Sequence, residues 1–185
     1  MPINDPLMFA ITVPLLIVVT LCTITDVLEH RIYNSVLLPA LLLAFLLNTL
    51  LAGLPGLLDS FLGLVFGMAV LFPIYFLRGT SAGDVKLLGV VGAFLGTKGA
   101  LIAGVATLCF GGVLGILFVV WRLIEPIVIA HVAQIAGPDG PPGRRMMTAT
   151  RADSAWKAVF PYALAIACGT CYALWHLGYF SPVLR

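Results

Sequence analysis

Two aspartates, Asp26 and Asp84, are the residues of this sequence whose type and position are best suited to chemistry. Asp26 follows one apolar run and Asp84 precedes another, so each lies at the end of a lipid-soluble segment. Two carboxylates held close together cannot both ionise cheaply, so one keeps a proton near neutral pH. The ionised carboxylate can then accept a proton from a bound water while the protonated one polarises a carbonyl group. Either aspartate could begin as the base, because such a pair titrates as a unit.

The other acidic residues have ordinary positions at a surface or in a loop. They are Asp5, Glu29, Asp59, Glu125, Asp139 and Asp153. A charged side chain at membrane depth is costly, which makes it a functional candidate. At the membrane edge the same side chain can simply be hydrated, and Asp84 could serve as a helix N-cap. Position alone therefore leaves a purely structural role open for both aspartates.

The residues beside the two aspartates strengthen the functional interpretation. Gly83 places no side chain next to Asp84, so we expect a substrate backbone to approach there. The apolar run Val85 to Leu95 would be only about 17 Å long as a helix, which puts Asp84 below the lipid headgroups. After the other aspartate, Arg31 and Asn34 are expected to anchor the turn at the membrane interface.

The composition places these residues in a membrane. Of 185 residues, only 10% are charged and 61% are hydrophobic, whereas a soluble domain carries about 25% charged residues. These values exclude an ordinary soluble domain, a disordered chain and a nucleic-acid binder, and they leave a protein dissolved in lipid. Cys168 and Cys171 resemble half of a zinc site, but the second pair is missing. We therefore expect no metal.

Six apolar runs predict an all-α fold, a polytopic transmembrane bundle of about six spans. Sheet edges cannot be satisfied in lipid, which excludes an open sheet. The runs are Leu7 to Thr25, Val36 to Leu54, Leu58 to Leu77, Val85 to Leu95, Ala100 to Trp121 and Ala158 to Leu177. We expect residues 1–185 to form a single membrane-embedded domain.

The basic residues predict the orientation of this bundle. With the N-terminus outside, the inner segments lie near residues 26–35, 78–86 and 122–157 and hold eight of the ten bases. The eight are Arg31, Arg78, Lys86, Arg122, Arg144, Arg145, Arg151 and Lys157. This distribution follows the positive-inside rule, and it places both candidate aspartates at the inner edge. Residues 134–157 contain several Gly and Pro and are expected to form a flexible cytoplasmic loop.

Glycines spaced by three and four residues predict close helix packing. Gly89, Gly92 and Gly96 share one face of the run that follows Asp84. Such small-residue faces let helix backbones approach closely. We expect this face to bring the run against the first helix, next to Asp26.

The segments around the two aspartates resemble the type IV prepilin peptidase family, of the GxGD class of intramembrane aspartyl proteases. That family has an aspartate followed by an Arg-Ile-Pro-Asn element, and Asp26 with Arg31-Ile32-Tyr33-Asn34 is similar in spacing. It also has a Gly-x-Gly-Asp segment that commonly continues Val-Lys-Leu, which Gly83-Asp84-Val85-Lys86-Leu87 resembles. A weaker likeness is Phe160-Pro161-Tyr162-Ala163 at the start of the last run. The chain departs from the family at Tyr33, where proline is usual, and at Ser81, where the first glycine is expected.

The resemblance implies an aspartic endopeptidase with Asp26 and Asp84 as its catalytic residues. Gly83, Lys86, Arg31 and Asn34 are then supporting positions, and Lys86 is expected to anchor at headgroups rather than to catalyse. The implied substrate is a prepilin with an N-terminal leader and an apolar helix, cleaved at the cytoplasmic face of a prokaryotic inner membrane. The chain has no cysteine-rich insertion after its first run, so it resembles the short form that serves tight-adherence (Flp-type) pili. We expect no cofactor and no methyltransferase activity.

Two other classes of protein remain open at this stage. A small transporter or channel component could use Asp26 and Asp84 as proton or cation sites. Against it, both acids lie at one edge and no inverted repeat is visible. A non-catalytic membrane scaffold could instead use the glycine faces to bind partner helices.

Overall fold

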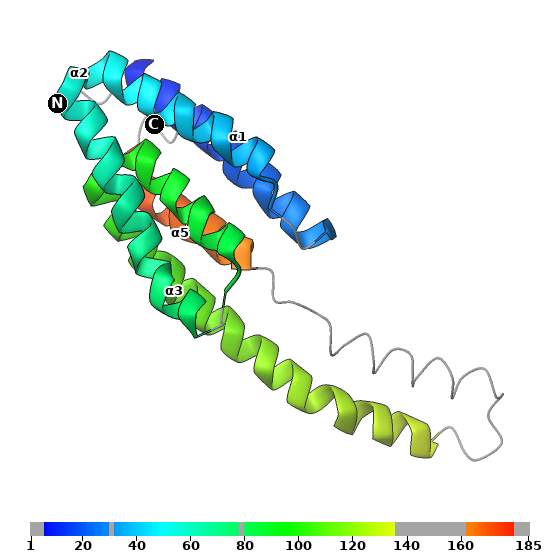
Figure 1. Cartoon of the computed structure of the whole chain (residues 1–185). Helices are drawn as coiled ribbons and strands as arrows, with labels where there is room; N and C mark the ends of the chain where they lie inside the picture. The colour runs from blue at the N-terminus through cyan, green and yellow to red at the C-terminus, as the bar shows by residue number, and fades with distance from the viewer. Residues whose placement is uncertain (1–5, 30–31, 78–79, 136–161, 180–185) are drawn as a thin grey trace. The chain divides into compact units, whose positions relative to one another are not determined.

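The computed structural model describes residues 6–29, 32–77, 80–135 and 162–179. These residues form the helices α1 (Pro6–Glu29), α2 (Asn34–Phe76), α3 (Ala82–Ile135) and α5 (Tyr162–His176), drawn in Figure 1. The all-α fold class is confirmed. Within the described part of the chain, three helical segments are long and apolar enough to cross a membrane, namely Phe9–Glu29, Asn34–Phe76 and Ala82–Pro126.

Each of the two longest helices is broken at one glycine. Gly53 in α2 has φ 65° and ψ −149°, and Gly96 in α3 has φ 70° and ψ −176°. A side chain would be strained at these backbone angles, so glycine is required for the break. The breaks lie within one residue of Leu54 and Leu95, where two of the predicted apolar runs end. Each long helix therefore consists of two helical stretches.

Polar side chains satisfy the backbone on the N-terminal side of the Gly96 break. The carbonyl oxygen of Ala93 accepts hydrogen bonds from Ser60 Oγ at 2.6 Å and from Asn48 Nδ2 at 3.1 Å. Asn48 Nδ2 also lies 3.4 Å from the carbonyl oxygen of Phe94. The last carbonyls of a helix lack intrahelical donors, and in lipid water cannot easily replace them. The two side chains thus stabilise the end of the stretch 82–95.

Asp59 caps the other side of the same break. Its Oδ1 accepts hydrogen bonds from the Thr97 backbone nitrogen at 3.1 Å and from Thr97 Oγ1. A Cβ atom on Gly96 would lie 2.1 Å from Asp59 Oδ2, so the carboxylate packs directly against the glycine. Asp59 is exposed, as expected of a surface acid. It also accepts the N–H at the start of the helical stretch after the break, a capping role that its position in the sequence did not reveal.

The glycine face after Asp84 packs against α2, so the expected packing against the first helix is wrong. A Cβ atom on Gly92 would lie 2.1 Å from the carbonyl oxygen of Gly63, and one on Gly63 would lie 2.2 Å from that of Gly92. A Cβ atom on Gly89 would similarly meet the Met68 side chain at 2.6 Å. The spacing predicts a face that permits close approach, but it does not determine which neighbour covers that face.

The remaining contacts place α5 between α1 and α3. Helix α1 packs against both α2 and α5 (Figure 1). A Cβ atom on Gly169 of α5 would lie 2.3 Å from Thr107 Oγ1 of α3, which shows how closely these two helices approach.

The chain divides into a unit of residues 1–111 with 161–185 and a unit of residues 112–160. The candidate site lies within the first unit. Of the loop predicted at 134–157, residues 134 and 135 end α3, and the rest lies outside the described residues.

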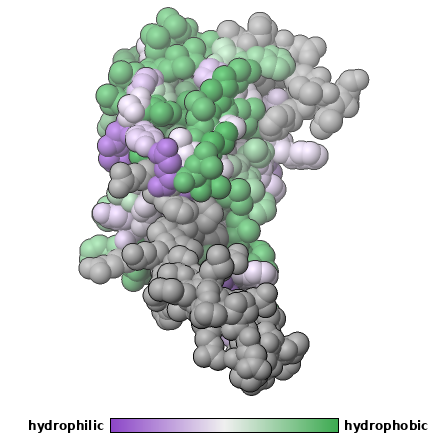
Figure 2. Space-filling model, turned by 90° about the vertical axis from the view of Figure 1, so that its right-hand side faces the viewer, coloured by the Kyte–Doolittle hydropathy of each residue, from purple (hydrophilic) through white to green (hydrophobic). Residues whose placement is uncertain are grey.

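The described surface is largely apolar. On the face shown in Figure 2, hydrophobic residues cover most of the described area, and polar residues gather in small groups. Large exposed side chains include Ile17, Leu42, Phe61, Val105 and Ile116. A monomeric soluble protein rarely exposes contiguous apolar patches of this kind, whereas lipid solvates them without cost. The surface therefore supports the membrane location that the composition predicts.

Candidate active site

Asp26 lies in the last turn of α1, with its side chain turned into the bundle. The residue is 8% exposed, and its Oδ2 accepts a hydrogen bond from the backbone nitrogen of Ala163 at 3.3 Å. Ala163 is the second residue of α5, and the first N–H groups of a helix have no intrahelical acceptor. A carboxylate at this position is further stabilised by the helix dipole. Asp26 thus joins the C-terminal end of α1 to the start of α5.

Asp84 lies in the first turn of α3 and is 3% exposed. Its Oδ2 accepts a hydrogen bond from the backbone nitrogen of Ser81 at 2.9 Å, and its own backbone nitrogen donates to Ser81 Oγ at 3.3 Å. This reciprocal pair of bonds is a capping box, with aspartate in the place of the more usual glutamate. The second oxygen, Oδ1, is buried and has no hydrogen-bond partner among the described residues.

The structure brings the two predicted aspartates together, because their carboxylates interact electrostatically across the helix ends. Two further side chains belong to this group. The phenol of Tyr162, which is 7% exposed, interacts electrostatically with Asp84. The thiol of Cys22, one turn before Asp26 on α1, interacts with the Asp26 carboxylate. Two buried carboxylates near enough to influence each other electrostatically are an arrangement that suits acid–base chemistry on water.

Gly83, the second residue of α3, allows the start of this helix to lie close to the turn after α1. A Cβ atom on Gly83 would lie 3.0 Å from Cβ of Ile32 and 3.3 Å from its Cδ1. Ile32 therefore occupies the direction in which a side chain of residue 83 would point, and the missing side chain allows the two aspartate segments to pack closely. The approach of a substrate backbone beside Asp84 stays a prediction.

Lys86 and Asn34 also connect the two segments. Lys86 Nζ donates a hydrogen bond to Asn34 Oδ1 at 3.2 Å. Lys86 was expected to anchor at headgroups, but the structure gives it a partner in the first turn of α2. Arg31, the remaining supporting position, lies outside the described residues.

Tyr33, in the place of the family's proline, has φ −79° and ψ 123° at the N-cap of α2. Its carbonyl oxygen accepts hydrogen bonds from the backbone nitrogens of Val36 at 3.1 Å and Leu37 at 3.3 Å. Its phenol donates to Glu29 Oε2 at the end of α1. The tyrosine thus connects α1 to α2 across the turn that follows Asp26.

Some residues of the site were not predicted from the sequence. The spacing Ser81-x-x-Asp84 is that of a capping box and could have assigned the Ser81 hydroxyl a role. The contact between Asp26 and Ala163 joins residues 137 positions apart, and no local pattern indicates it. Tyr162 lies in a segment that resembles the family, but its position against Gly111 and near Asp84 follows only from the packing of α5.

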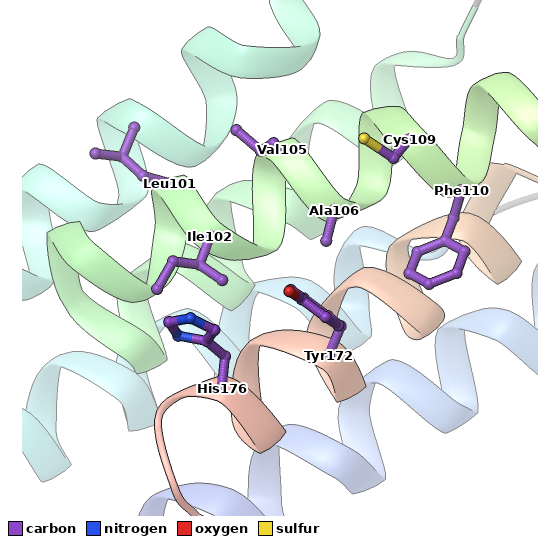
Figure 3. A pocket seen from close by; sticks show the side chains of 8 residues that line it. All are labelled: Leu101, Ile102, Val105, Ala106, Cys109, Phe110, Tyr172 and His176. Carbon is purple, nitrogen blue, oxygen red and sulfur yellow. The ribbon is translucent and has the colours of Figure 1, made fainter.

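A separate apolar groove of about 540 Å³ lies between α3 and α5. Figure 3 shows Tyr172 and His176 of α5 facing a row of α3 side chains. The α3 residues that line it are Leu101, Ile102, Val105, Ala106, Cys109 and Phe110. Neither aspartate lines this groove, so it is distinct from the site.

A helical membrane protein with two interacting, buried aspartates has the architecture of an intramembrane aspartic peptidase. The sequence model of the type IV leader peptidase family matches residues 13–116, more than half of this chain, and the chain belongs to that family. It is accordingly a prepilin peptidase, an aspartic endopeptidase of the membrane. No curated protein and no solved structure matches the chain. The matched segment includes both aspartates and ends before α5.

Proposed function

We propose that Asp26 and Asp84 are the catalytic pair of this peptidase. The observation that carries the proposal is that both carboxylates are buried in one region, near enough to influence each other electrostatically, with Oδ1 of Asp84 unpartnered among the described residues. Natural proteins rarely leave a buried polar atom unsatisfied, and exceptions often have a functional reason. Both aspartates lie in the segment that matches the family. A purely structural role would account for the bonded oxygens of the two side chains but not for the unpartnered one.

The reaction proceeds by attack of water on the peptide bond between leader and mature pilin. The ionised carboxylate accepts a proton from a bound water, and the protonated carboxylate donates a hydrogen bond to the scissile carbonyl oxygen. The oxygen of the water bonds to the carbonyl carbon, and the resulting tetrahedral intermediate breaks its C–N bond. The products are a carboxylic acid on the leader and an amine on the mature protein. The amine nitrogen takes up the proton that the base accepted from the attacking water.

The proposed substrate is a Flp-like prepilin cleaved at the cytoplasmic face of a prokaryotic inner membrane. Helix α1 ends at Glu29 and α2 begins at Asn34, so the turn between them leaves no room for a zinc-binding insertion. This arrangement is that of the short form described above. The breaks at Gly53 and Gly96 support six spans, with the N-terminus outside, as the distribution of bases predicts. Both aspartates then lie at the inner edge, where a prepilin leader enters the membrane.

A cleavage assay tests the proposal. The purified protein in lipid is incubated with a Flp-type prepilin, and the shortened pilin is followed by mass spectrometry. We expect cleavage by the wild type and loss of activity in Asp26→Asn and Asp84→Asn. Asp59→Asn is the matched control, because it also removes one carboxylate, which lies at the Gly96 break, at the opposite end of the stretch 82–95 from Asp84. Activity that survives in both aspartate variants would refute the assignment of the pair.

The assay also tests the substrate class. A second prepilin, of the type cleaved by family members that carry the cysteine-rich insertion, is offered in the same lipid mixture beside the Flp-type substrate. We expect kcat/KM to favour the Flp-type substrate. Equal processing of both substrates would refute the narrower specificity while leaving the peptidase assignment intact.

A further inference from the structure

We propose that Ser81 is a positioning residue that orients the Asp84 carboxylate so that Oδ1 is the oxygen that reacts. The proposal rests on the function proposed for Asp84. Ser81 departs from the family pattern, in which glycine is expected at this position. The hydroxyl group is therefore a feature of this chain that the family resemblance does not explain.

The hydrogen bonds around Ser81 determine which carboxylate oxygen is available. Oδ2 of Asp84 is bonded to the Ser81 backbone nitrogen at 2.9 Å, and Oδ1 remains unpartnered in the buried interior. A half rotation of the carboxylate exchanges the two oxygens and gives an equivalent arrangement, whereas any intermediate rotation breaks the bond to the Ser81 nitrogen. The bonded oxygen thus holds the plane of the carboxylate, and Oδ1 is left to contact water or a carbonyl group.

The Ser81 hydroxyl maintains this arrangement by holding the backbone of the first turn. Ser81 Oγ accepts the backbone N–H of Asp84 at 3.3 Å, while the Ser81 carbonyl oxygen accepts that of Val85 at 3.4 Å. The hydroxyl and the carbonyl oxygen together make Ser81 the N-cap of α3. Without the hydroxyl, the N–H of Asp84 loses its acceptor within the protein, and the first turn of α3 is held less firmly. A first turn that shifts also shifts the Ser81 N–H, so the Asp84 carboxylate loses part of the bond that orients it.

Three variants of Ser81 test this role in the full-length protein in lipid. Ser81→Ala removes the hydroxyl and the cap, whereas Ser81→Gly removes the hydroxyl but leaves a residue that caps helices nearly as well. Ser81→Thr keeps a hydroxyl at the same position. We expect both Ser81→Ala and Ser81→Gly to lower kcat about tenfold with KM changed less than twofold, since small displacements of reacting groups cost rate rather than affinity. Ser81→Thr should recover most of the wild-type kcat.

The controls separate this proposal from the proposed function. Thermal unfolding of each variant, followed by circular dichroism, reports loss of the fold, and Ser81→Gly is the variant expected to melt closest to the wild type. Wild-type kcat in Ser81→Gly, with Asp84→Asn inactive, would overturn the positioning role and leave the catalytic pair in place. Cleavage that persists in Asp84→Asn would instead remove the function on which the proposal rests.

Discussion

Lys86 Nζ on α3 lies 3.2 Å from Asn34 Oδ1 on α2 and donates a hydrogen bond to it. The two residues belong to different aspartate segments and are separated by 52 positions in the chain. With the contact between Gly83 and Ile32, this bond fixes the turn after Asp26 against the start of the helix that carries Asp84. The relative position of the two aspartates therefore depends on a bond at the exposed edge of the bundle.

Loss of the bond between Lys86 and Asn34 should have a small effect on stability and a larger one on rate. We expect Lys86→Met and Asn34→Ala each to lower the free energy of unfolding by about 0.5–1 kcal/mol, the usual net value of a hydrogen bond. Each should lower kcat several-fold, because the aspartates lose part of their alignment. The double variant should be no worse than either single one, as a double-mutant cycle would show. Lys98→Met is the control, and an equal loss of rate there would contradict the prediction.

Gly111 and Gly112 form a matched pair for testing the position of Tyr162. A Cβ atom on Gly111 would lie 2.6 Å from the Tyr162 hydroxyl, whereas one on Gly112 meets nothing within 4 Å. We expect Gly111→Ala to displace the Tyr162 ring, to cost about 1–3 kcal/mol of stability and to lower the cleavage rate. Gly112→Ala should leave the rate unchanged. Thermal melting and the prepilin assay measure both effects, and equal behaviour of the two variants would show that Tyr162 is not held by Gly111.

The glycine contact between α2 and α3 should be intolerant of any side chain. Gly92→Ala places a methyl group 2.1 Å from the backbone oxygen of Gly63, and backbone atoms cannot move aside as a side chain can. We expect a loss of at least about 1–3 kcal/mol, seen as a lower melting temperature in lipid or detergent. Gly115→Ala meets nothing within 4 Å. This control should be neutral or stabilising by up to about 1 kcal/mol, because alanine favours helix. Similar melting temperatures for the two variants would contradict the packing described.

Asp59 should affect stability without affecting the chemical step. Asp59→Ala removes the cap at Thr97 and is expected to cost about 1 kcal/mol, while Asp59→Asn keeps an acceptor oxygen and should cost less. The kcat of the folded fraction should equal that of the wild type in both variants. The measurement pairs a melting curve with an active-enzyme titration. Inactivation by Asp59→Asn as complete as that by Asp84→Asn would count against Asp26 and Asp84 as the sole pair.

The features predicted from the sequence are those that depend on local pattern. The lack of charge predicts the membrane, and the apolar runs end within one residue of the breaks at Gly53 and Gly96. The two aspartates stood out because a carboxylate is costly at the end of a lipid-soluble run. The electrostatic influence of one buried carboxylate on the other agrees with that interpretation. Their catalytic role stays a prediction.

The features that were mispredicted depend on which helices become neighbours. The face of Gly92 is packed closely, but against Gly63 of α2 rather than against the first helix. The N–H of Ala163 reaches Asp26 only because α5 packs beside α1. Helix packing in a membrane is decided by shape and polar contacts over the whole bundle, and a single segment carries little of that information.

The break at Gly96 bears on how a hydrolase obtains its water. The stretch from Ala82 to Leu95 is about 21 Å long, roughly 9 Å less than the thickness of a typical hydrocarbon core. Asp84 lies in its first turn, and the carbonyl oxygen of Ala93 near its end is satisfied by Asn48 and Ser60. If this stretch crosses the bilayer by itself, the membrane has to thin beside it. A thinner leaflet brings solvent closer to Asp84 without a pore through the protein, and water is the second reactant of hydrolysis.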